Sequence, residues 1–351
     1  MITNAILFGA VVIIAFLLLV IGLIFSYLVF KRNKEMHFQR KVNAYIETYE
    51  QEWYRYLLHG ESIEEALKHT SFDYDVREAI DKIFITYVTT INNAEVRKNI
   101  SRFATLNMQK HYGKLLESPE WADRLNVLRR TMLFDLQFLV PIIEGKLKQN
   151  EIEQMEEYLV VLQVISTYNP NLFLAHLYAP RMKMSEYDYK VILAHIDESY
   201  IKRFIRHFDE LPIRLQLSLL DYLSLHTTMD SEYLYFYEKL LDSIHVEIRI
   251  RVLKAISTFG MVADLAAYEQ FLTSSEWQER LMFAKVLRLV EGKQAVNMLQ
   301  VLLCDMNWRV RKQAALTLKT KKNGLRLLQE MAHQTEDAFA ADMAKEVLGI
   351  R

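Results

Sequence analysis

Small and apolar residues recur at a fixed spacing in the C-terminal part of the chain, over residues 243–333. They follow an arginine at the third, fourth and seventh positions after it, which is the periodicity of one helix face. The arginines Arg249, Arg280 and Arg311 are 31 residues apart each time (280 − 249 and 311 − 280). The residues that follow them are Val252, Leu253 and Ile256, then Phe283, Ala284 and Leu287, then Ala314, Ala315 and Leu318. A 31-residue period of this kind predicts helix–turn–helix units stacked into an α-solenoid.

These units resemble HEAT repeats, particularly the short form related to phycobilisome-lyase repeats. The resemblance rests on I-R-I-R-V-L-K-A-I-S-T-F-G, Q-E-R-L-M-F-A-K-V-L-R-L-V-E-G and R-V-R-K-Q-A-A-L-T-L. It implies a helical surface for binding, and it implies that Arg249, Arg280 and Arg311 brace neighbouring repeats. The acids expected to pair with them are Asp242, Asp305 and Asp337. The alternative for the three arginines is an anion-binding row.

The rest of the chain predicts helices too, in a less regular pattern. Only 9 glycines and 5 prolines occur in 351 residues, which is typical of an all-α protein. Residues 42–210 are predicted to form an irregular helical region of diverged repeats, and residues 211–351 the regular repeats. The helix expected at 338–348 ends the array as a cap. Candidate degenerate units begin near Arg97, Arg124 and Arg214.

Local signals predict where some of these helices begin and end. Ser118 and Pro119 predict a helix start, with serine as the N-cap and proline at the first helical position. Six glycines stand where an apolar pattern stops, and each predicts a helix end. They are Gly60, Gly113, Gly145, Gly260, Gly292 and Gly324.

The N-terminal segment is apolar for long enough to cross a bilayer. Residues 5–30 contain no charged side chain, and a helix of this length exceeds a hydrocarbon core of about 30 Å. The alternative, a cleaved signal peptide, calls for a basic start and a shorter apolar run. We therefore expect a single transmembrane helix at 5–30, with residues 1–4 outside the cytoplasm.

A basic juxtamembrane segment, residues 31–41, follows the apolar run. Five basic residues against Glu35 give it a net charge of +5 − 1 = +4. Because basic flanks stay cytoplasmic, we expect an inner or plasma membrane protein with its solenoid in the cytoplasm. The same cluster could also contact anionic lipid. It consists of Lys31, Arg32, Lys34, Arg40 and Lys41.

The sequence carries no motif for catalysis, a cofactor or a metal. It contains no glycine-rich phosphate loop, no G-x-S-x-G and no H-E-x-x-H, and no two of its 10 histidines are three or four residues apart. Cys304, the only cysteine, ends an apolar helix and is expected to be buried. Residues 42–351 carry about −5 net charge (−1 − 4), which argues against nucleic-acid binding. We expect no catalytic residue, no cofactor and no metal ligand.

Three aromatic residues are candidates for contact with a protein partner. Tyr235 points away from an aromatic helix face that is predicted to be core (positions 233, 236, 237, 240 and 244), and the alternative is an isolated surface tyrosine. Trp277 and Trp308 are 31 residues apart, each three residues before its arginine. Both are expected to pack the turns between repeats, and if exposed they would anchor a partner.

These observations predict a membrane-tethered, non-enzymatic scaffold that docks a protein partner on a cytoplasmic HEAT-like solenoid. A tether raises the local concentration of whatever the solenoid binds. One alternative is an accessory subunit of a membrane complex such as an envelope-polysaccharide glycosyltransferase, by analogy with other anchored repeat proteins. Another is a lyase-type enzyme that attaches a cofactor, which would need a convergent set of polar residues.

Overall fold

The computed structural model describes residues 2–63, 67, 73–91, 93–226 and 231–350, with side chains from residue 16 onward. Throughout these residues the regular elements are helices, which confirms the all-α prediction. The chain divides into two compact units, Met1–Val164 and Ile165–Arg351. This division separates two compact groups of helices. The predicted boundary near residue 210 is of another kind, because it separates irregular repeats from regular ones.

The first unit packs short helices against the C-terminal part of one long helix, α1. The helices α3 and α4 contact α1 directly, and α6 packs on α3, α4 and α5. The helix α8 runs across the boundary between the units. The elements are α1 (Ile2–His59), α3 (Tyr74–Thr90), α4 (Ala94–Asn107), α5 (Gln109–Leu116), α6 (Trp121–Phe134), η1 (Gln137–Leu139), α7 (Val140–Gln149) and α8 (Met155–Tyr168).

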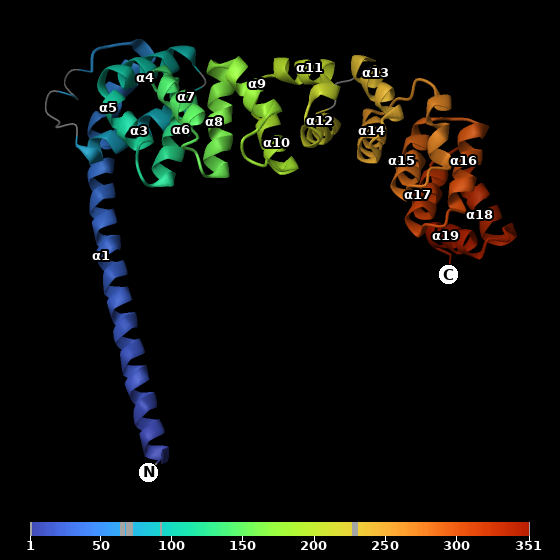
Figure 1. Cartoon of the computed structure of the whole chain (residues 1–351), viewed down its shortest axis with the longest axis horizontal. Coiled ribbons are helices and arrows are strands. Elements are labelled where there is room, and N and C mark those ends of the chain that lie inside the picture. Colours follow the sequence, from blue (N-terminus) through green and yellow to red (C-terminus); the bar gives the residue numbers. More distant parts are fainter. Residues whose placement is uncertain (1, 64–66, 68–72, 92, 227–230, 351) are drawn as a thin grey trace. The chain divides into compact units, whose positions relative to one another are not determined.

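One continuous helix, α1, holds both the predicted membrane span and the first part of the predicted helical region 42–210. The described part with the required length and composition is Phe16–His59, whose most apolar window has a mean hydropathy of 1.7 and is not buried. The N-terminal part of α1 stands free of the other helices of its unit (Figure 1). This segment is therefore a candidate membrane anchor or signal sequence.

Aromatic side chains fix the C-terminal part of α1 in the first unit. Trp53 is fully buried, and its ring centroid lies 5.4 Å from that of Phe84 on α3 and 4.9 Å from that of Phe103 on α4. The side chain of Asn99 donates hydrogen bonds to the carbonyl oxygens of Tyr56 (3.3 Å) and Leu57 (3.1 Å), the latter near the end of α1. Burying three aromatic rings contributes several kcal/mol in all, so α1 and the helices around it form one core.

The second unit stacks its helices in series, and each contacts the next. The helices α10, α12, α14, α15, α17 and α19 contact one another in this order, while α16 and α18 pack as second helices beside α17 and α19. The unit is thus repeat-like. Its elements are α9 (Pro170–Tyr178), α10 (Glu186–Leu193), α11 (Glu198–Arg206), η2 (Phe208–Glu210), α12 (Ile213–Leu225), α13 (Ser231–Lys239), η3 (Leu240–Asp242), α14 (Val246–Phe259), η4 (Leu265–Leu272), α15 (Trp277–Val286), η5 (Leu287–Leu289), α16 (Lys293–Leu303), α17 (Trp308–Lys319), α18 (Gly324–Gln334) and α19 (Ala338–Leu348).

Several predicted helix ends differ from the structure. Gly260 is a left-handed C-cap at φ 86°, as predicted, but Gly113 and Gly145 lie inside α5 and α7. Gly324 starts α18 instead of ending a helix. The position requires glycine because a Cβ there would lie 1.8 Å from the Leu318 carbonyl oxygen. The helix expected from Ser118 begins at Trp121, with the serine hydroxyl accepting a hydrogen bond from the Glu120 amide (3.2 Å).

Candidate functional site

An arginine occupies the fourth position of each of four helices, α6, α14, α15 and α17. In every case its Nη1 donates to the carbonyl oxygen six residues earlier, in the turn that leads into the helix. The side chain therefore ties the first turn of its own helix to that turn. The four contacts are Arg124 to Ser118 (2.8 Å), Arg249 to Ser243 (2.6 Å), Arg280 to Ser274 (2.6 Å) and Arg311 to Asp305 (2.7 Å).

Three of these arginines also reach a carboxylate from the following part of the chain. Arg280 makes the closest pair, with Nε 2.5 Å and Nη2 3.0 Å from the two oxygens of Asp305. The side chains are only 15% and 6% exposed, and the hydrogen bond that Arg280 donates to Asp305 raises the pKa of Arg280. The remaining pairs are Arg124 with Glu157 (2.9 and 2.8 Å) and Arg249 with Glu279 (2.7 Å).

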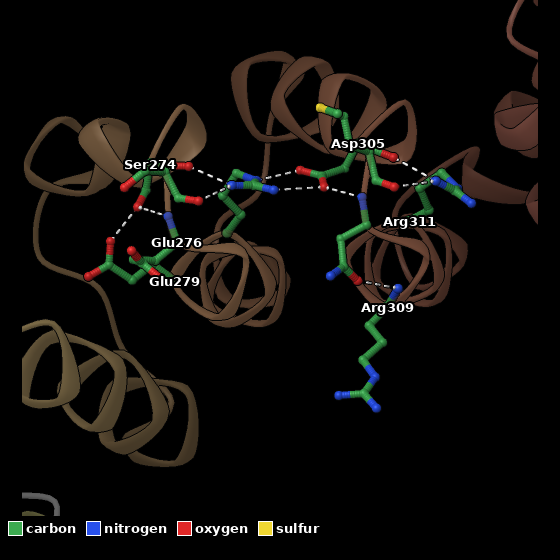
Figure 2. A network of polar contacts seen from close by, with 10 residues as sticks. Ser274, Glu276, Glu279, Asp305, Arg309 and Arg311 are labelled. Atoms are coloured by element: carbon green, nitrogen blue, oxygen red, sulfur yellow. Dashed lines mark hydrogen bonds and ion pairs between the residues drawn. The ribbon is translucent and has the colours of Figure 1, made fainter.

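Asp305 links two successive arginines in this way. Its carboxylate accepts from Arg280, while its backbone carbonyl accepts from Arg311 (2.7 Å), and Figure 2 shows it between the Ser274 turn and Arg311. Because the ion pair joins α15 to the turn before α17, it acts between the first helices of successive repeats.

The other two acids expected to pair with the arginines make different contacts. Asp242 accepts from the side chain of Gln270 (3.0 Å), and Asp337 caps α19 by accepting from the amides of Phe339 and Ala340. As a result Arg311 has no carboxylate partner among the described residues. Its guanidinium lies 5.2 Å from the centroid of the Phe339 ring, and its Nε is buried without a hydrogen bond.

The predicted residue Arg214 takes a different place from the four arginines. It is the second residue of α12 and donates to the carbonyl oxygen of Met184 (2.9 Å). The fourth residue of α12 is Gln216, whose amide donates to the carbonyl oxygens of Phe208 (2.9 Å) and Leu211 (3.0 Å). A neutral amide therefore fills the arginine position of this helix.

Trp277 and Trp308 are the first residues of α15 and α17, and one arginine contacts both rings. The guanidinium carbon of Arg309 lies 5.2 Å from the Trp277 ring centroid and 5.6 Å from that of Trp308. Trp308 is 54% exposed, Trp277 is half-buried, and the neighbouring Met306 is 97% exposed. Arg309 extends away from the row formed by Asp305 and Arg311 (Figure 2). We call Trp277, Met306, Trp308 and Arg309 the tryptophan edge.

Tyr235 is exposed on α13, as a contact residue would have to be. The prediction for the face behind it is wrong at one position: Ile244 is exposed, whereas Phe236, Tyr237 and Leu240 are buried. The reason is that α13 ends at Lys239 and the 3₁₀ helix η3 follows, so the α-helical period does not extend to residue 244.

The basic residues after the apolar run have different surroundings. Lys31 and Lys34 line a hollow between α1 and the other helices of the first unit, with Arg32 exposed on α1 between them. Lys41 lies 3.8 Å from the carboxylate of Asp75 on α3, so part of its charge is compensated. Arg40 is exposed.

Two polar clusters of the second unit were not predicted. The buried ammonium of Lys321 donates to the carbonyl oxygens of Arg288 (2.9 Å) and Val290 (2.7 Å) and lies 3.2 Å from Glu291. It ties the end of α17 to the turn before α16. A lysine on the polar side of a helix end gives no periodic signal, and so only the fold identifies it.

The second of these clusters joins α10, α12 and α14 through Asp221. Lys190 lies 2.6 Å and Arg251 2.7 Å from Asp221, on the helices before and after it. Burial favours a higher pKa for Asp221, but the hydrogen bond from Lys190 and the charges of Arg251 and Lys254 hold that pKa below its ordinary value. These three residues are 31 and 30 residues apart (221 − 190 and 251 − 221), close to the repeat period, and this spacing is the sequence signal that could have identified the cluster.

The only cysteine of the sequence, Cys304, is not buried as predicted. Cys304 is exposed, not buried, because it follows the last residue of α16 and begins the turn toward α17. Partial burial of the sulfur, together with the neighbouring Asp337, raises the pKa of the thiol. Over the residues that the structure describes, no group of three histidine, cysteine or acidic side chains is placed to hold a metal ion.

Comparison with known proteins gives no family. No protein-family model matches the chain, and no curated protein matches it. A crystal structure described as that of an engineered protein aligns with 81% of this chain and 80% of its own, at 14% identity and a TM-score of 0.33. The described residues form an all-helical, repeat-like protein, and the distant structural match assigns no family.

Proposed function

We propose that this protein is a membrane-tethered, non-enzymatic scaffold that docks a protein partner on a cytoplasmic HEAT-like solenoid. The observation that carries the proposal is the tryptophan edge, a surface with two indole rings, a methionine and a guanidinium at the starts of the neighbouring helices α15 and α17. Tryptophan and arginine are the residues most enriched among those that dominate binding energy at protein interfaces.

The repeated arginine position supports the solenoid part of the proposal. An arginine at the fourth helical position, bonded to the preceding turn, recurs from Arg124 in the first unit to Arg311 in the second. Units that share such a contact and pack on their neighbours are characteristic of α-solenoids, which bind proteins on extended surfaces.

The surroundings of Arg309 indicate the chemistry of the partner. In the described part of the chain no carboxylate lies within ion-pair distance of this guanidinium, although it contacts two indole rings. Met306 adjoins it as an almost fully exposed apolar side chain. We infer a partner that presents a carboxylate beside an apolar side chain, so that the acid pairs with Arg309 and the apolar group covers Met306 and Trp308.

The N-terminal helix supports the tether. Residues 16–30 are apolar and unburied, and the positive cluster 31–41 follows them directly. With the N-terminus outside and the basic flank inside, residues 31–351 lie in the cytoplasm. Tethering would keep a weakly bound partner at the membrane, because a second contact made within one complex benefits from a high effective concentration.

The test is site-specific photo-crosslinking in the cell followed by binding measurements with the purified partner. A photoreactive residue at position 308 should capture a protein that one at position 121 does not. Trp121 is the matched control because it is also the first residue of a helix with a bracing arginine and is 51% exposed, but lies in the first unit.

The captured protein is then titrated against variants of the full chain. Arg309→Ala should weaken its binding by at least tenfold, about 1.4 kcal/mol, while Arg326→Ala on α18 should leave it unchanged. Equal affinity of the Arg309→Ala variant and the natural protein would refute the docking surface.

A further inference from the structure

A hollow of about 820 Å³ lies in the first unit, beside the point where the apolar part of α1 ends. Its walls come from α1, α3, α5 and α6, and the part of α1 that lines it begins at Tyr27. Sites for small ligands typically enclose about 300–1,000 Å³. The hollow thus has the size of a binding site and lies next to the proposed membrane surface.

The wall formed by α1 changes character along the helix. Tyr27 and Phe30 come first, Lys31 and Lys34 next, and Glu35 follows. Their spacing of three and four residues places them on one face of the helix. Moving away from the apolar segment, this face is therefore aromatic, then basic, then acidic.

The opposite wall adds further acidic groups. Glu78 on α3 and Asp123 on α6 both line the hollow and are half-buried, and Asp123 accepts a hydrogen bond from the hydroxyl of Ser118 (2.9 Å). With Glu35, three carboxylates face a space that also contains the cationic side chains of Lys31 and Lys34.

One more cation on this wall is held by a buried acid. Arg130 lies 3.2 Å from the carboxylate of Asp81, which also accepts a hydrogen bond from the buried hydroxyl of Tyr112. Burial raises the pKa of Asp81 to about 6, with Arg130 and Tyr112 opposing the rise. His111 stays neutral, because burial and the charges of Arg77 and Arg130 lower its pKa to about 4.

At the end away from the apolar segment, Phe38 and Gln39 of α1 and Tyr74 of α3 line the hollow. The Phe38 and Tyr74 ring centroids are 5.4 Å apart, and Lys82 of α3 donates to the side chain of Gln39 (2.6 Å). At the other end the rings of Tyr27 and Phe30 are exposed. The hollow can therefore be reached from the side of the apolar segment.

We propose that the hollow binds the headgroup of an aminophospholipid, with Lys31 and Lys34 on its phosphate and Glu35 and Glu78 on its primary ammonium. The acyl chains then run along Phe30 into the bilayer. The order of charges on α1 matches this ligand, since Lys31 and Glu35 are separated by about 6 Å along the helix axis, four residues at 1.5 Å each. The inference rests on the proposed function in one respect, that the apolar part of α1 lies in a membrane.

The charge balance distinguishes this lipid from others. The hollow presents three cations, Lys31, Lys34 and Arg130, and three carboxylates, so a purely anionic headgroup would meet repulsion from Glu35, Glu78 and Asp123. A quaternary ammonium headgroup carries no N–H groups, whereas a primary ammonium donates up to three hydrogen bonds to carboxylates. The expected order of preference is phosphatidylethanolamine before phosphatidylglycerol and phosphatidylcholine.

Native mass spectrometry of the full chain tests the inference. The chain is released from nanodiscs that contain the three lipids in equal parts, and the lipids retained are identified. We expect phosphatidylethanolamine to be retained at least tenfold over each of the others. Lys34→Gln and Glu78→Gln should each abolish this preference, while Arg32→Gln, two residues from Lys34 but outside the hollow, should leave it intact.

A charge reversal gives a gain of function that a folding defect would not produce. Glu78→Lys should shift retention from phosphatidylethanolamine to phosphatidylglycerol, because a cation replaces the group that binds ammonium. Unselective retention by the natural protein, or preferential retention of phosphatidylglycerol, would overturn the proposal. So would tight binding of free phosphoethanolamine to the chain in phosphatidylcholine nanodiscs, since the ligand would then be soluble. If the chain fails to enter nanodiscs at all, the proposed membrane anchor is wrong, and the lipid site that rests on it is overturned as well.

Discussion

The Arg280→Ala substitution should weaken the junction between α15 and α17 by about 3 kcal/mol. It removes two hydrogen bonds to Asp305 and the bond of 2.6 Å to the Ser274 carbonyl oxygen. Among the described residues, the carboxylate of Asp305, which is 6% exposed, then keeps only the hydrogen bond from the amide of Asn307 (2.8 Å). Removing one partner of a buried ion pair costs about 3–5 kcal/mol, and the lower end applies because the arginine is 15% exposed.

Native-state amide hydrogen exchange on the full chain in detergent is the assay. Stacked repeats open in parts, so the relevant quantity is the local opening free energy of α15 and α17. Arg326→Ala is the control, because that side chain is 73% exposed and pairs only with Glu330 on its own helix. Its effect should stay within about 0.5 kcal/mol.

Arg311→Ala provides an intermediate case. This arginine keeps the bond to the turn but has no carboxylate in the described part of the chain, so its loss should cost about 1–2 kcal/mol. The predicted order of cost is Arg280, then Arg311, then Arg326. If Arg280→Ala and Arg326→Ala had the same effect, or if Arg311→Ala cost as much as Arg280→Ala, the ion pair with Asp305 would not stabilise the junction.

Three further predictions follow from single side chains. An impermeant maleimide should label Cys304 in inside-out vesicles and not in intact cells, whereas a Thr3→Cys, Cys304→Ser variant should show the reverse; labelling of Cys304 from outside would refute the orientation. Lys321→Ala should lower the local opening free energy of α17 by about 2–3 kcal/mol, and the control Lys322→Ala should lower it by less than about 0.5 kcal/mol. Equal effects of the two substitutions would show that the buried ammonium does not stabilise the end of α17. Folding lowers the pKa of His111 from 6.5 to about 4, so stability is lost as pH falls from 6.5 toward 4. In urea unfolding, the natural protein should lose about 1–2 kcal/mol more than a His111→Gln variant between pH 7 and pH 5. Parallel pH profiles of the two proteins would contradict this.

The sequence was sufficient to predict where the repeat helices lie, but not every acid that pairs with their arginines. The apolar positions after each arginine follow the helical period, and they were enough to locate α14, α15 and α17. Of the acids expected to pair with the arginines, Asp305 does so, with Arg280, whereas Asp242 and Asp337 make other contacts. Arg249 pairs with Glu279, adjacent to the next arginine in the sequence, and not with the expected Asp242.

The remaining differences also have local causes. A 3₁₀ helix between α13 and α14 ends the period that placed Ile244 in the core, and the turn after α16 exposes Cys304. The hollow beside α1 combines residues from four helices, so Glu78 and Asp123 could not be connected to Lys34 without the fold. The tryptophan edge was only partly predicted, because Arg309 has no counterpart at the equivalent positions of the two earlier repeats, Gln278 and Glu247.

The central claim, that the solenoid holds a partner at the membrane, is tested most directly by the location of that partner in the cell. The protein captured at position 308 is followed by membrane fractionation in three strains: with the natural chain, with residues 5–30 deleted, and with residues 5–30 replaced by an unrelated apolar helix of the same orientation. The account predicts that the partner is membrane-bound in the first and third strains and soluble in the second. A partner that stays on the membrane after the deletion, or that is not restored by the replacement helix although the hybrid chain is inserted and stable, would contradict a tethered scaffold.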